Sequence, residues 1–314
     1  MTSNVSSTLS SKIPSTPQGF RSGFIGIIGR PNVGKSTIMN QLIGQKIVIT
    51  SNVSQTTRNR LKGILTTDTE QMIFVDTPGI HKPHHNLGKI IVKNAKITIN
   101  SVDIILLVVD SSTLSGGGDH YIINLLKNTD KTVIVGLNKS DKQTVKHEEL
   151  DASYLNLIKE YKWPIVKFSA LTKEGLGNLQ NLLIKNLDYG PYYYHPSLAT
   201  DQPEKFIIQE LIREQVLHLT RQEIPHSVAI IVEKIEETPT VTKIFAAINV
   251  EKNSQKGIVI GSKGNMLKLI GTQSRIQIQK LIAGEVYLKL FVKVESNWRF
   301  SDGCLANFGY GYED

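Results

Sequence analysis

Short apolar runs alternate with longer helical patterns over the first part of the chain. Runs rich in aliphatic and β-branched residues predict strands at 24–29, 71–76, 103–110, 131–138 and 164–170. Several are followed by apolar residues spaced three and four apart, which predict helices such as 35–44 and 174–187. This alternation favours an α/β architecture with a mostly parallel sheet covered by helices on both faces. Ligand-binding loops in such folds lie at the carboxyl ends of the strands.

A proline- and tyrosine-rich segment at 188–205 interrupts this rhythm and predicts an interdomain linker. The pattern beyond it predicts a small α+β unit, with helices and strands at 206–220, 227–235, 242–252, 261–283 and 286–295. The expected organisation is a tail, a first domain, the linker, a second domain and a C-terminal tail, at 1–21, 22–187, 188–205, 206–300 and 301–314.

The N-terminal tail is rich in serine and threonine and lacks the apolar core of a secretory signal. We expect it to be disordered, with a transit peptide as the alternative. The longest purely aliphatic run, IILLVV at 104–109, is too short to span a bilayer. Cys304 is the single cysteine, which excludes an intramolecular disulfide and fits a reducing compartment.

The first glycine-rich loop, GRPNVGKS at 29–36, follows a predicted strand and begins a predicted helix, as a P-loop does. The backbone N–H groups of such a loop hold the α- and β-phosphates of a nucleotide. We expect Lys35 to reach the β/γ-oxygens and the Ser36 hydroxyl to ligate Mg²⁺. The predicted phosphate-binding residues are Gly29, Arg30, Pro31, Asn32, Val33, Gly34, Lys35, Ser36 and Thr37.

The base is indicated by NKSD at 138–141, at the end of another predicted strand. A carboxylate at Asp141 accepts two parallel hydrogen bonds from the N–H edge of guanine, which adenine does not offer. Alone, NKSD could be a helix N-cap; after a P-loop it favours GTP over ATP. Asn138 would hold the loop and base, the Lys139 stem would cover the purine, and the Ala170 N–H would meet guanine O6. The predicted base-binding residues are Asn138, Lys139, Ser140, Asp141, Ser169, Ala170 and Leu171.

Two further motifs, DTPG at 76–79 and QTTR at 55–58, predict contacts to Mg²⁺ and the γ-phosphate. Asp76 would hold the metal through water, and the Gly79 N–H would contact the γ-phosphate. Thr57 is preferred to Thr56 as the second hydroxyl ligand because it directly precedes Arg58. The predicted nucleotide-binding residues of this segment are Asp76, Thr77, Pro78, Gly79 and Ile80. The predicted metal ligands are Ser36, Thr57 and Asp76. The residues predicted to act in catalysis are Lys35, Thr57, Gly79 and Asn32.

A second glycine turn, GSKG at 261–264, lies between two helical patterns with strands on either side. This is the KH arrangement, whose loop clamps about four single-stranded nucleotides. Of the net charge of +8, +6 falls between residues 251 and 300, with nine basic and three acidic residues. A polyanion partner fits this concentration of charge, although a solvated basic face is the alternative. The predicted RNA contacts are Ile258, Ile260, Gly261, Ser262, Lys263, Gly264 and Lys268, with Leu267 also lining the groove.

The GTPase motifs, taken in order, resemble those of the translation-factor-related GTPases. GRPNVGKSTIMNQLIGQKIVITSNVSQTTRNR, TDQPEKF and REQVLHLTRQEIPHSVAIIVEKIEE resemble the Era-like ribosome-assembly GTPases in particular. The resemblance covers both domains and implies a GTPase domain followed by a type II KH domain. It further implies binding of GTP, GDP and Mg²⁺, and binding of the 3′ end of 16S rRNA during 16S rRNA processing and assembly of the 30S subunit. A cytoplasmic monomer, with peripheral association with the inner membrane, is also expected.

Ile80 stands where many GTPases place a glutamine that orients the attacking water. An aliphatic side chain cannot do this, and the Era-like family shares the substitution. We expect slow intrinsic hydrolysis of GTP. We expect the hydrolysis rate to be raised either by K⁺ bound near Asn32 or by a group supplied by bound RNA or by another partner. The nearby histidines, His81, His84 and His85, are expected to be solvent-exposed.

Two alternative functions remain at this point. The chain could be an RNA-binding assembly factor for which hydrolysis is incidental, and Ile80 keeps that hypothesis open. A tRNA-modification GTPase is less well supported, because no domain is expected before residue 22 and because of the C-terminal GxxG turn.

Overall fold

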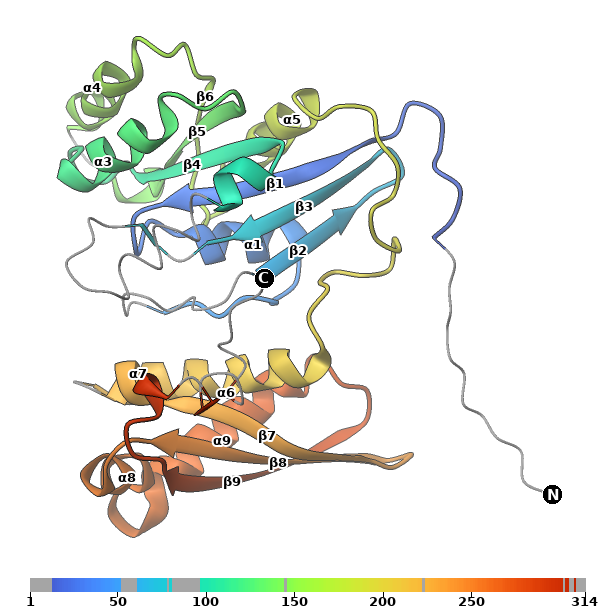
Figure 1. Cartoon of the computed structure of the whole chain (residues 1–314), viewed down its shortest axis with the longest axis vertical. Helices are drawn as coiled ribbons and strands as arrows, with labels where there is room; N and C mark the ends of the chain where they lie inside the picture. The colour runs from blue at the N-terminus through green and yellow to red at the C-terminus, as the bar shows by residue number, and fades with distance from the viewer. Residues whose placement is uncertain are drawn as a thin grey trace. The chain divides into compact units, whose positions relative to one another are not determined.

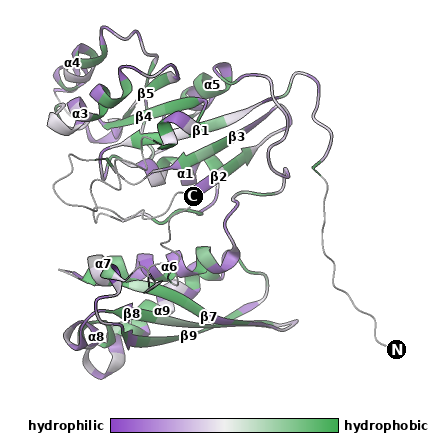
Figure 2. Cartoon of the chain, viewed as in Figure 1, coloured by the Kyte–Doolittle hydropathy of each residue, from purple (hydrophilic) through white to green (hydrophobic). Residues whose placement is uncertain are grey.

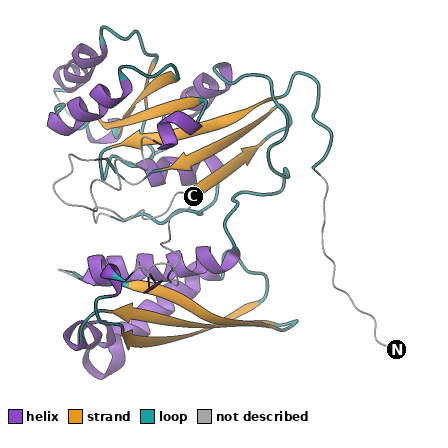
Figure 3. Cartoon of the chain, in the orientation of Figure 1, coloured by secondary structure: helices purple, strands orange, loops and turns teal. Residues whose placement is uncertain are grey.

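The computed structural model describes residues 13–51, 61–77, 79–80, 97–143, 146–221, 224–301, 303–304 and 308. The chain divides into two compact units. The first is Met1–Gln45 with Leu61–Asp201, and the second is Lys46–Arg60 with Gln202–Asp314. Each described unit contains a sheet with helices packed on it (Figures 1 and 3). The short segment after the P-loop helix therefore belongs to the second unit, which the sequence did not predict.

The described part of the first unit contains a sheet with strand order β2-β3-β1-β4-β5-β6. β2 pairs antiparallel with β3, whereas the other neighbours pair parallel. The mostly parallel α/β fold is confirmed. β2 was not predicted, because Lys62, Gly63 and Thr66 interrupt its apolar pattern. The strands are β1 (Arg21–Gly29), β2 (Leu61–Thr66), β3 (Glu70–Asp76), β4 (Ile104–Asp110), β5 (Thr132–Asn138) and β6 (Ile165–Lys167).

Helices cover this sheet because its strands are apolar on both faces, as Figure 2 shows for β4 and β5. Alternate residues of β4 and β5 share one buried cluster with Ile122 and Ile123 of α3 and Tyr154 of α4. Successive strand side chains point to opposite faces, so the other residues are left for the opposite layer. The described helices are α1 (Lys35–Ile43), α3 (Gly117–Leu126), α4 (His147–Ile158), α5 (Leu176–Lys185) and a 3₁₀ turn, Ser140–Lys142.

Most of the predicted linker lies against the first unit. The amide of Gln71, which is fully buried, donates to the Tyr194 carbonyl at 2.9 Å. Its oxygen accepts from the N–H groups of Tyr193 and Tyr194 at 2.8 and 3.0 Å. Farther along, the Ile64 N–H donates to the Ala199 carbonyl at 2.8 Å. Residues 188–201 therefore form part of the first unit, and only a few residues separate them from the next helix.

The second unit contains a sheet of order β7-β8-β9 over its described residues. β7 pairs antiparallel with β8, and β8 pairs parallel with β9. Figure 1 shows α6 running along one side of this sheet, and α6, α8 and α9 contribute to its buried core. The elements are α6 (Glu204–Leu219), α7 (Ile224–Ser227), β7 (Ala229–Glu237), β8 (Val241–Val250), α8 (Asn253–Ile260), α9 (Asn265–Ile278), β9 (Glu285–Val294) and 3₁₀ turns at Ser262–Gly264 and Trp298–Phe300.

This order of elements is the one predicted for a type II KH domain. The parallel strands β8 and β9 are joined through α8, the glycine turn and α9. A crossover is needed because parallel neighbours start at the same end of the sheet. The glycine turn is thereby placed between two helices. Among the described helices, none is both long enough and apolar enough to cross a lipid bilayer.

Candidate functional site

The P-loop joins β1 to α1 through a backbone that only glycine adopts readily. Gly34 has φ 101°, and a Cβ added there would lie 2.4 Å from the Asn138 amide nitrogen. Helix α1 begins at the next residue, Lys35, so its first N–H groups lack partners within the helix. Such a helix start, with its positive dipole end, favours a phosphate. The loop therefore has the backbone that a nucleotide diphosphate requires.

Lys35 is the buried cation of this loop. Its ammonium donates to the carbonyls of Gly29 at 3.2 Å and Arg30 at 2.8 Å. Burial lowers the pKa of Lys35 to about 8, although the Asp76 carboxylate acts in the opposite direction. A phosphate beside the ammonium would raise that pKa again, because an anion favours the charged form.

Ser36 and Asp76 lie side by side. The Ser36 hydroxyl donates to Asp76 Oδ2 at 3.2 Å, and Asp76 is fully buried at the end of β3. A hydroxyl and a carboxylate are the oxygen ligands that Mg²⁺ prefers, so this pair fits the predicted metal site. The third predicted ligand, Thr57, lies outside the described residues, as do Pro78 and the three histidines of the 81–85 loop.

The residues that follow Asp76 are tied to the P-loop and to the core. A Cβ on Gly79 would lie 2.6 Å from Pro31 Cα, so this glycine packs directly on the P-loop. The Ile80 N–H donates to the Gly29 carbonyl at 3.0 Å, while its side chain is buried in the α3–α4 cluster. Thr77 is also buried and donates to the Ile27 carbonyl at 2.8 Å. Ile80 and Thr77 therefore have structural contacts, and their side chains do not lie in an open nucleotide site.

The buried amide of Asn138 connects three loops. Its nitrogen donates to the Val33 carbonyl of the P-loop at 2.7 Å. Its oxygen accepts from the Ala170 N–H at 2.9 Å, and its backbone carbonyl accepts from the Ser111 hydroxyl at 2.8 Å. The prediction that Asn138 holds the loop agrees with these bonds. The Ala170 N–H, predicted to meet guanine O6, has the Asn138 oxygen as its partner here.

Lys139 directly precedes the 3₁₀ turn Ser140–Lys142, and Asp141 lies within that turn. The Lys139 ammonium donates to the Asn32 carbonyl at 2.7 Å and pairs with Asp110 at 2.5 Å, which holds its stem in place. Burial opposes ionisation of Asp110, but the bonds from Lys139 and Ser112 outweigh it and lower its pKa. Asp110 is a supporting residue that sequence reasoning missed; its position as the polar end of a predicted strand was the available signal.

The carboxylate of Asp141 is exposed, and a hydrogen bond fixes its orientation. The fully buried Ser169 donates its hydroxyl hydrogen to Oδ1 of Asp141 at 2.5 Å, which fixes the orientation of the carboxylate. Leu171, which ends the same loop, is 70% exposed, so its side chain is free to cover a planar ligand. Ser140 begins the 3₁₀ turn that contains Asp141, and its N–H donates to the Phe168 carbonyl at 3.3 Å.

The guanidinium of Arg30, a predicted phosphate-binding residue, forms an ion pair with a neighbouring helix. Its Nε lies 2.9 Å from Oδ1 of Asp119, a buried carboxylate in the first turn of α3. The same carboxylate accepts from the Gly116 N–H through its other oxygen at 2.9 Å. Arg30 therefore attaches the P-loop to α3. Asp119 is a second supporting residue that the sequence pattern did not single out.

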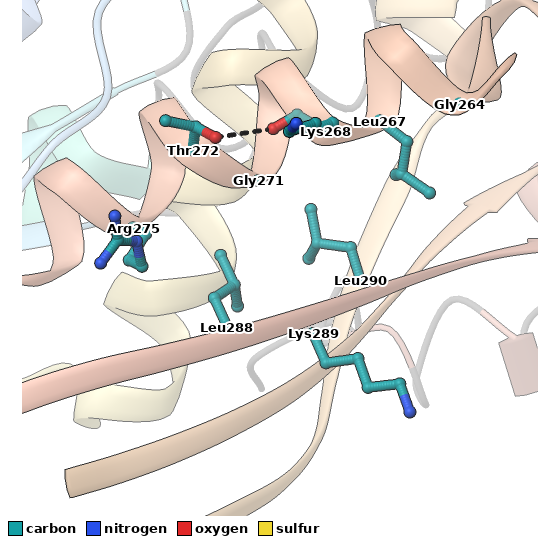
Figure 4. A pocket seen from close by; sticks show the side chains of 9 residues that line it. All are labelled: Gly264, Leu267, Lys268, Gly271, Thr272, Arg275, Leu288, Lys289 and Leu290. Atoms are coloured by element: carbon teal, nitrogen blue, oxygen red, sulfur yellow. Dashed lines mark hydrogen bonds between the residues drawn. The ribbon is translucent and has the colours of Figure 1, made fainter.

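The second unit contains a groove between α9 and β9 (Figure 4). The turn at its end has left-handed backbone at Lys263 (φ 51°) and Gly264 (φ 78°). Figure 4 shows Leu288 and Leu290 on the side of β9 that faces α9, whereas Lys289 points away. The groove is lined by Gly264, Leu267, Lys268, Gly271, Thr272, Arg275, Leu288, Lys289 and Leu290.

The predicted RNA contacts divide between this groove and its margin. Gly264, Leu267 and Lys268 line it, whereas Ile258, Ile260, Gly261, Ser262 and Lys263 are not among its lining residues. Ile258 is 41% exposed on α8. Arg275 and the β9 leucines were missed, because a residue one or more helical turns beyond GxxG, or on the returning strand, joins the groove only after folding.

Comparisons with known proteins agree with both units. A family model described as "50S ribosome-binding GTPase" matches residues 24–139, and a KH-domain model matches residues 223–299. The GTPase Era of Crocosphaera subtropica is 72% identical over 304 residues, which cover 97% of each chain. The chain belongs to the Era family of GTPases. A further relative, the GTPase Era of Rippkaea orientalis, is 67% identical over 313 residues and 100% of both chains.

Solved structures of Era proteins share the fold over 93% of this chain and 100% of their own. An Era complex with MgGDPNP and nucleotides 1506–1542 of 16S ribosomal RNA has a TM-score of 0.87 at 34% identity. A variant of Aquifex aeolicus Era bound to GDP.AlF4- has a TM-score of 0.87 at 35% identity. The Era-family assignment confirms that the chain is a GTPase with a KH domain.

Asp141→Asn should change the preferred base. The amide can accept only one of the two guanine hydrogen bonds, and its NH₂ group would oppose a guanine donor but match the carbonyl of xanthine. GDP affinity should fall on the order of 10³-fold while XDP affinity rises. Isothermal titration with both nucleotides measures this. Unchanged GDP affinity would show that Asp141 does not contact the base.

The lowered pKa of Lys35 predicts proton uptake when GDP binds. With a pKa of about 8 in the free protein and a higher one beside a phosphate, uptake should be roughly a tenth of a proton at pH 7 and roughly nine tenths at pH 9. Calorimetric titrations in buffers of different ionisation enthalpy measure it. Lys35→Arg, whose guanidinium stays charged, is the control that should abolish the pH dependence. Identical uptake in both proteins would contradict the assignment.

Proposed function

We propose that this Era-family GTPase binds GTP and Mg²⁺ at the P-loop and uses the nucleotide state to control RNA binding by its KH domain. The RNA is the single-stranded 3′ end of 16S rRNA, and the process is 16S rRNA processing and 30S subunit assembly. The observation that carries the proposal is the groove between α9 and β9, where Lys268 and Arg275 accompany three leucines beside the glycine turn. The Era complex with nucleotides 1506–1542 of 16S ribosomal RNA supports this partner.

The groove has the chemistry of a site for single-stranded RNA. The cations suit phosphates, the leucines offer an apolar surface to bases, and the glycine turn lets a sugar-phosphate chain approach closely. Because the apolar lining is in the same channel as the charges, an extended strand with its bases turned inward satisfies both. A duplex would keep its bases stacked away from the leucines.

At the nucleotide site each residue has a distinct role in this proposal. Mg²⁺, held by Ser36, Asp76 and Thr57, would neutralise phosphate charge when bound. Lys35 would add a fixed positive charge near the β/γ-phosphates, and the Gly79 N–H would bind the γ-phosphate. Because the Ile80 side chain is buried in the core, it does not orient a water molecule. We predict instead that hydrolysis is raised by K⁺ near Asn32, which would offset charge on the β/γ bridge, or by a group that a partner contributes.

A physical link between nucleotide and RNA starts at residues 46–51, in the second unit. Glu214 of α6 is fully buried and accepts from the Thr50 N–H at 2.9 Å, from its hydroxyl at 3.2 Å and from the Lys46 ammonium. His218, one turn later, bonds the Thr50 carbonyl at 2.9 Å through Nε2. The side chains of Ile47, Val48 and Ile49 are buried.

These contacts join the KH helix to the chain between the P-loop helix and Thr57. The Glu214 carboxylate is fully buried, so leaving it without its partners from residues 46–51 is costly, and α6 and this segment should move together. If GTP and Mg²⁺ draw Thr57 toward the metal, the pull passes to α6 through this anchor. Most of the predicted 188–205 linker, residues 188–201, belongs to the first unit.

Gly264→Asp, compared with Gly264→Asn, tests the groove. Both residues tolerate left-handed backbone and are nearly equal in size, and a side chain at this position meets no atom within 4 Å. Only aspartate adds a negative charge. We expect RNA affinity to fall at least tenfold more for aspartate than for asparagine, with GDP affinity unchanged.

The measurement is fluorescence anisotropy at physiological salt, with the 3′-terminal segment of 16S rRNA as ligand. Equal affinities for the two variants, or no loss in either, would show that RNA binds elsewhere.

Glu214→Gln tests the anchor. The amide keeps the size of the carboxylate but loses its charge, so its bonds to Lys46 and Thr50 weaken. We expect the ratio of RNA affinities in the GDPNP and GDP states to approach one, while RNA affinity in the GDP state changes less than twofold. Glu204→Gln, an exposed substitution on the same helix, should leave the ratio unchanged.

An unchanged ratio in Glu214→Gln would contradict the anchor as the link. A ratio of one in the native protein would instead favour an RNA-binding assembly factor for which hydrolysis is incidental.

We further propose a monomer that works in the cytoplasm. Peripheral association with the inner membrane remains a hypothesis, which flotation with lipid vesicles would test.

A further inference from the structure

The KH sheet has a second face, opposite to its helices. Along β9, Leu288, Leu290 and Val292 pack into the helix-covered core. Because successive side chains point to opposite sides, Tyr287, Lys289 and Phe291 lie on the other face. The register pairs Phe245 of β8 with Lys289, so Phe245 shares that face. Within the described part of the second unit, α6, α8 and α9 all contribute to the core on the helix side.

Three aromatic side chains lie on this face. Tyr287 and Phe291 are the diagonal neighbours of Phe245 across the β8–β9 pairing. Tyr287 is 50% exposed, and the other two are partly buried. The opposite end of the face, at Ala247 and Asn249, is buried, so the open part is the half that holds Phe245 and Tyr287.

Lysines surround the rings. The Lys289 ammonium lies 5.4 Å from the centroid of Phe291, and Lys243 is paired in register with Tyr287. Two glutamates on β7 are already engaged, Glu233 with Lys293 and Glu236 with Lys234. Within the described part of the chain, Lys243 and Lys289 form no ion pair. This face carries four lysines, which are Lys234, Lys243, Lys289 and Lys293. It carries three glutamates, which are Glu233, Glu236 and Glu285 at the start of β9.

We propose that this face, defined by Phe245, Tyr287, Lys289 and Phe291, is a second RNA-binding surface that stacks bases of a strand leaving the GxxG groove. β9 is the edge strand of the sheet, with the groove on one side and the aromatic face on the other. A strand that passes over this free edge therefore goes from Leu288 and Leu290 to Tyr287 and Phe245. The proposal rests on the groove being the primary RNA site.

The chemistry favours single-stranded RNA as the occupant. Every base has a π-face, so aromatic rings bind successive unpaired bases with little sequence preference, and neighbouring lysines pair with the phosphates. An apolar protein surface would gain little from the exposed Lys243 and Lys289, because it would have to desolvate them. The face would thus lengthen the bound strand beyond the about four nucleotides that a GxxG groove holds.

The test compares RNA lengths. Phe245→Thr with Tyr287→Ala removes two rings, and threonine keeps a β-branched residue in the strand. We expect the affinity for an oligonucleotide of about twelve nucleotides to fall about tenfold for each ring removed. The affinity for one of about four nucleotides that contains only the groove-binding segment should change less than twofold. Ile276→Ala, which truncates a 44% exposed residue of α9, is the matched control and should affect neither.

Fluorescence of Tyr287→Trp gives a direct readout of stacking. Its added emission, relative to the native protein, should be quenched by the long oligonucleotide and not by the short one. Equal affinity losses for both lengths, or no loss for the long one, would overturn the proposal. A change in sedimentation of the free protein on Tyr287→Ala would identify a second copy as the occupant and also overturn it. Failure of the native protein to bind the short RNA would instead refute the groove.

Discussion

The buried amide of Asn138 is the contact on which the nucleotide site depends. It holds the P-loop through the Val33 carbonyl and the 169–171 loop through the Ala170 N–H. The three loops start from the ends of different strands, and the Asn138 side chain ties them together. An unsatisfied polar group in this position would cost about 1–3 kcal/mol, so the amide both requires and enforces one arrangement. The residues for phosphate and for base are thereby kept at a constant separation.

Supporting residues extend this arrangement outward. Asp110 positions Lys139, Asp119 positions Arg30, and Ser169 orients Asp141. Each pair joins a predicted nucleotide-binding residue to one that belongs to the framework. Ile80 shows the opposite case, since its side chain lies in the core while its N–H holds the P-loop. A site built in this way has rigid charges for binding phosphate, but it leaves the orientation of water to a group outside these residues.

The chain passes between the two units on either side of residues 46–60 and again after Asp201. Residues 188–201 are held on the first unit by Gln71, whereas residues 46–51 are held on α6 by Glu214. The second contact is important for a switch, because it lies on the path from the P-loop helix to the predicted Mg²⁺ ligand. In the KH unit, the alternating side chains of β9 face the groove on one side and lie with Phe245 on the other face of the sheet.

The sequence alone determined the fold class and the order of the KH elements, and it predicted the P-loop and the NKSD motif as nucleotide contacts, because each depends on local spacing and on residues that meet in a single loop. It also predicted most strands and helices, since their apolar periods are strong. Only the tertiary structure decided that Ile80 and Thr77 are internal, that Arg30 pairs with Asp119 and that Arg275 lines the groove. It alone assigned residues 46–51 to the KH unit. These features depend on contacts between residues far apart in the chain, and local patterns carry no information about which distant side chain will be the partner.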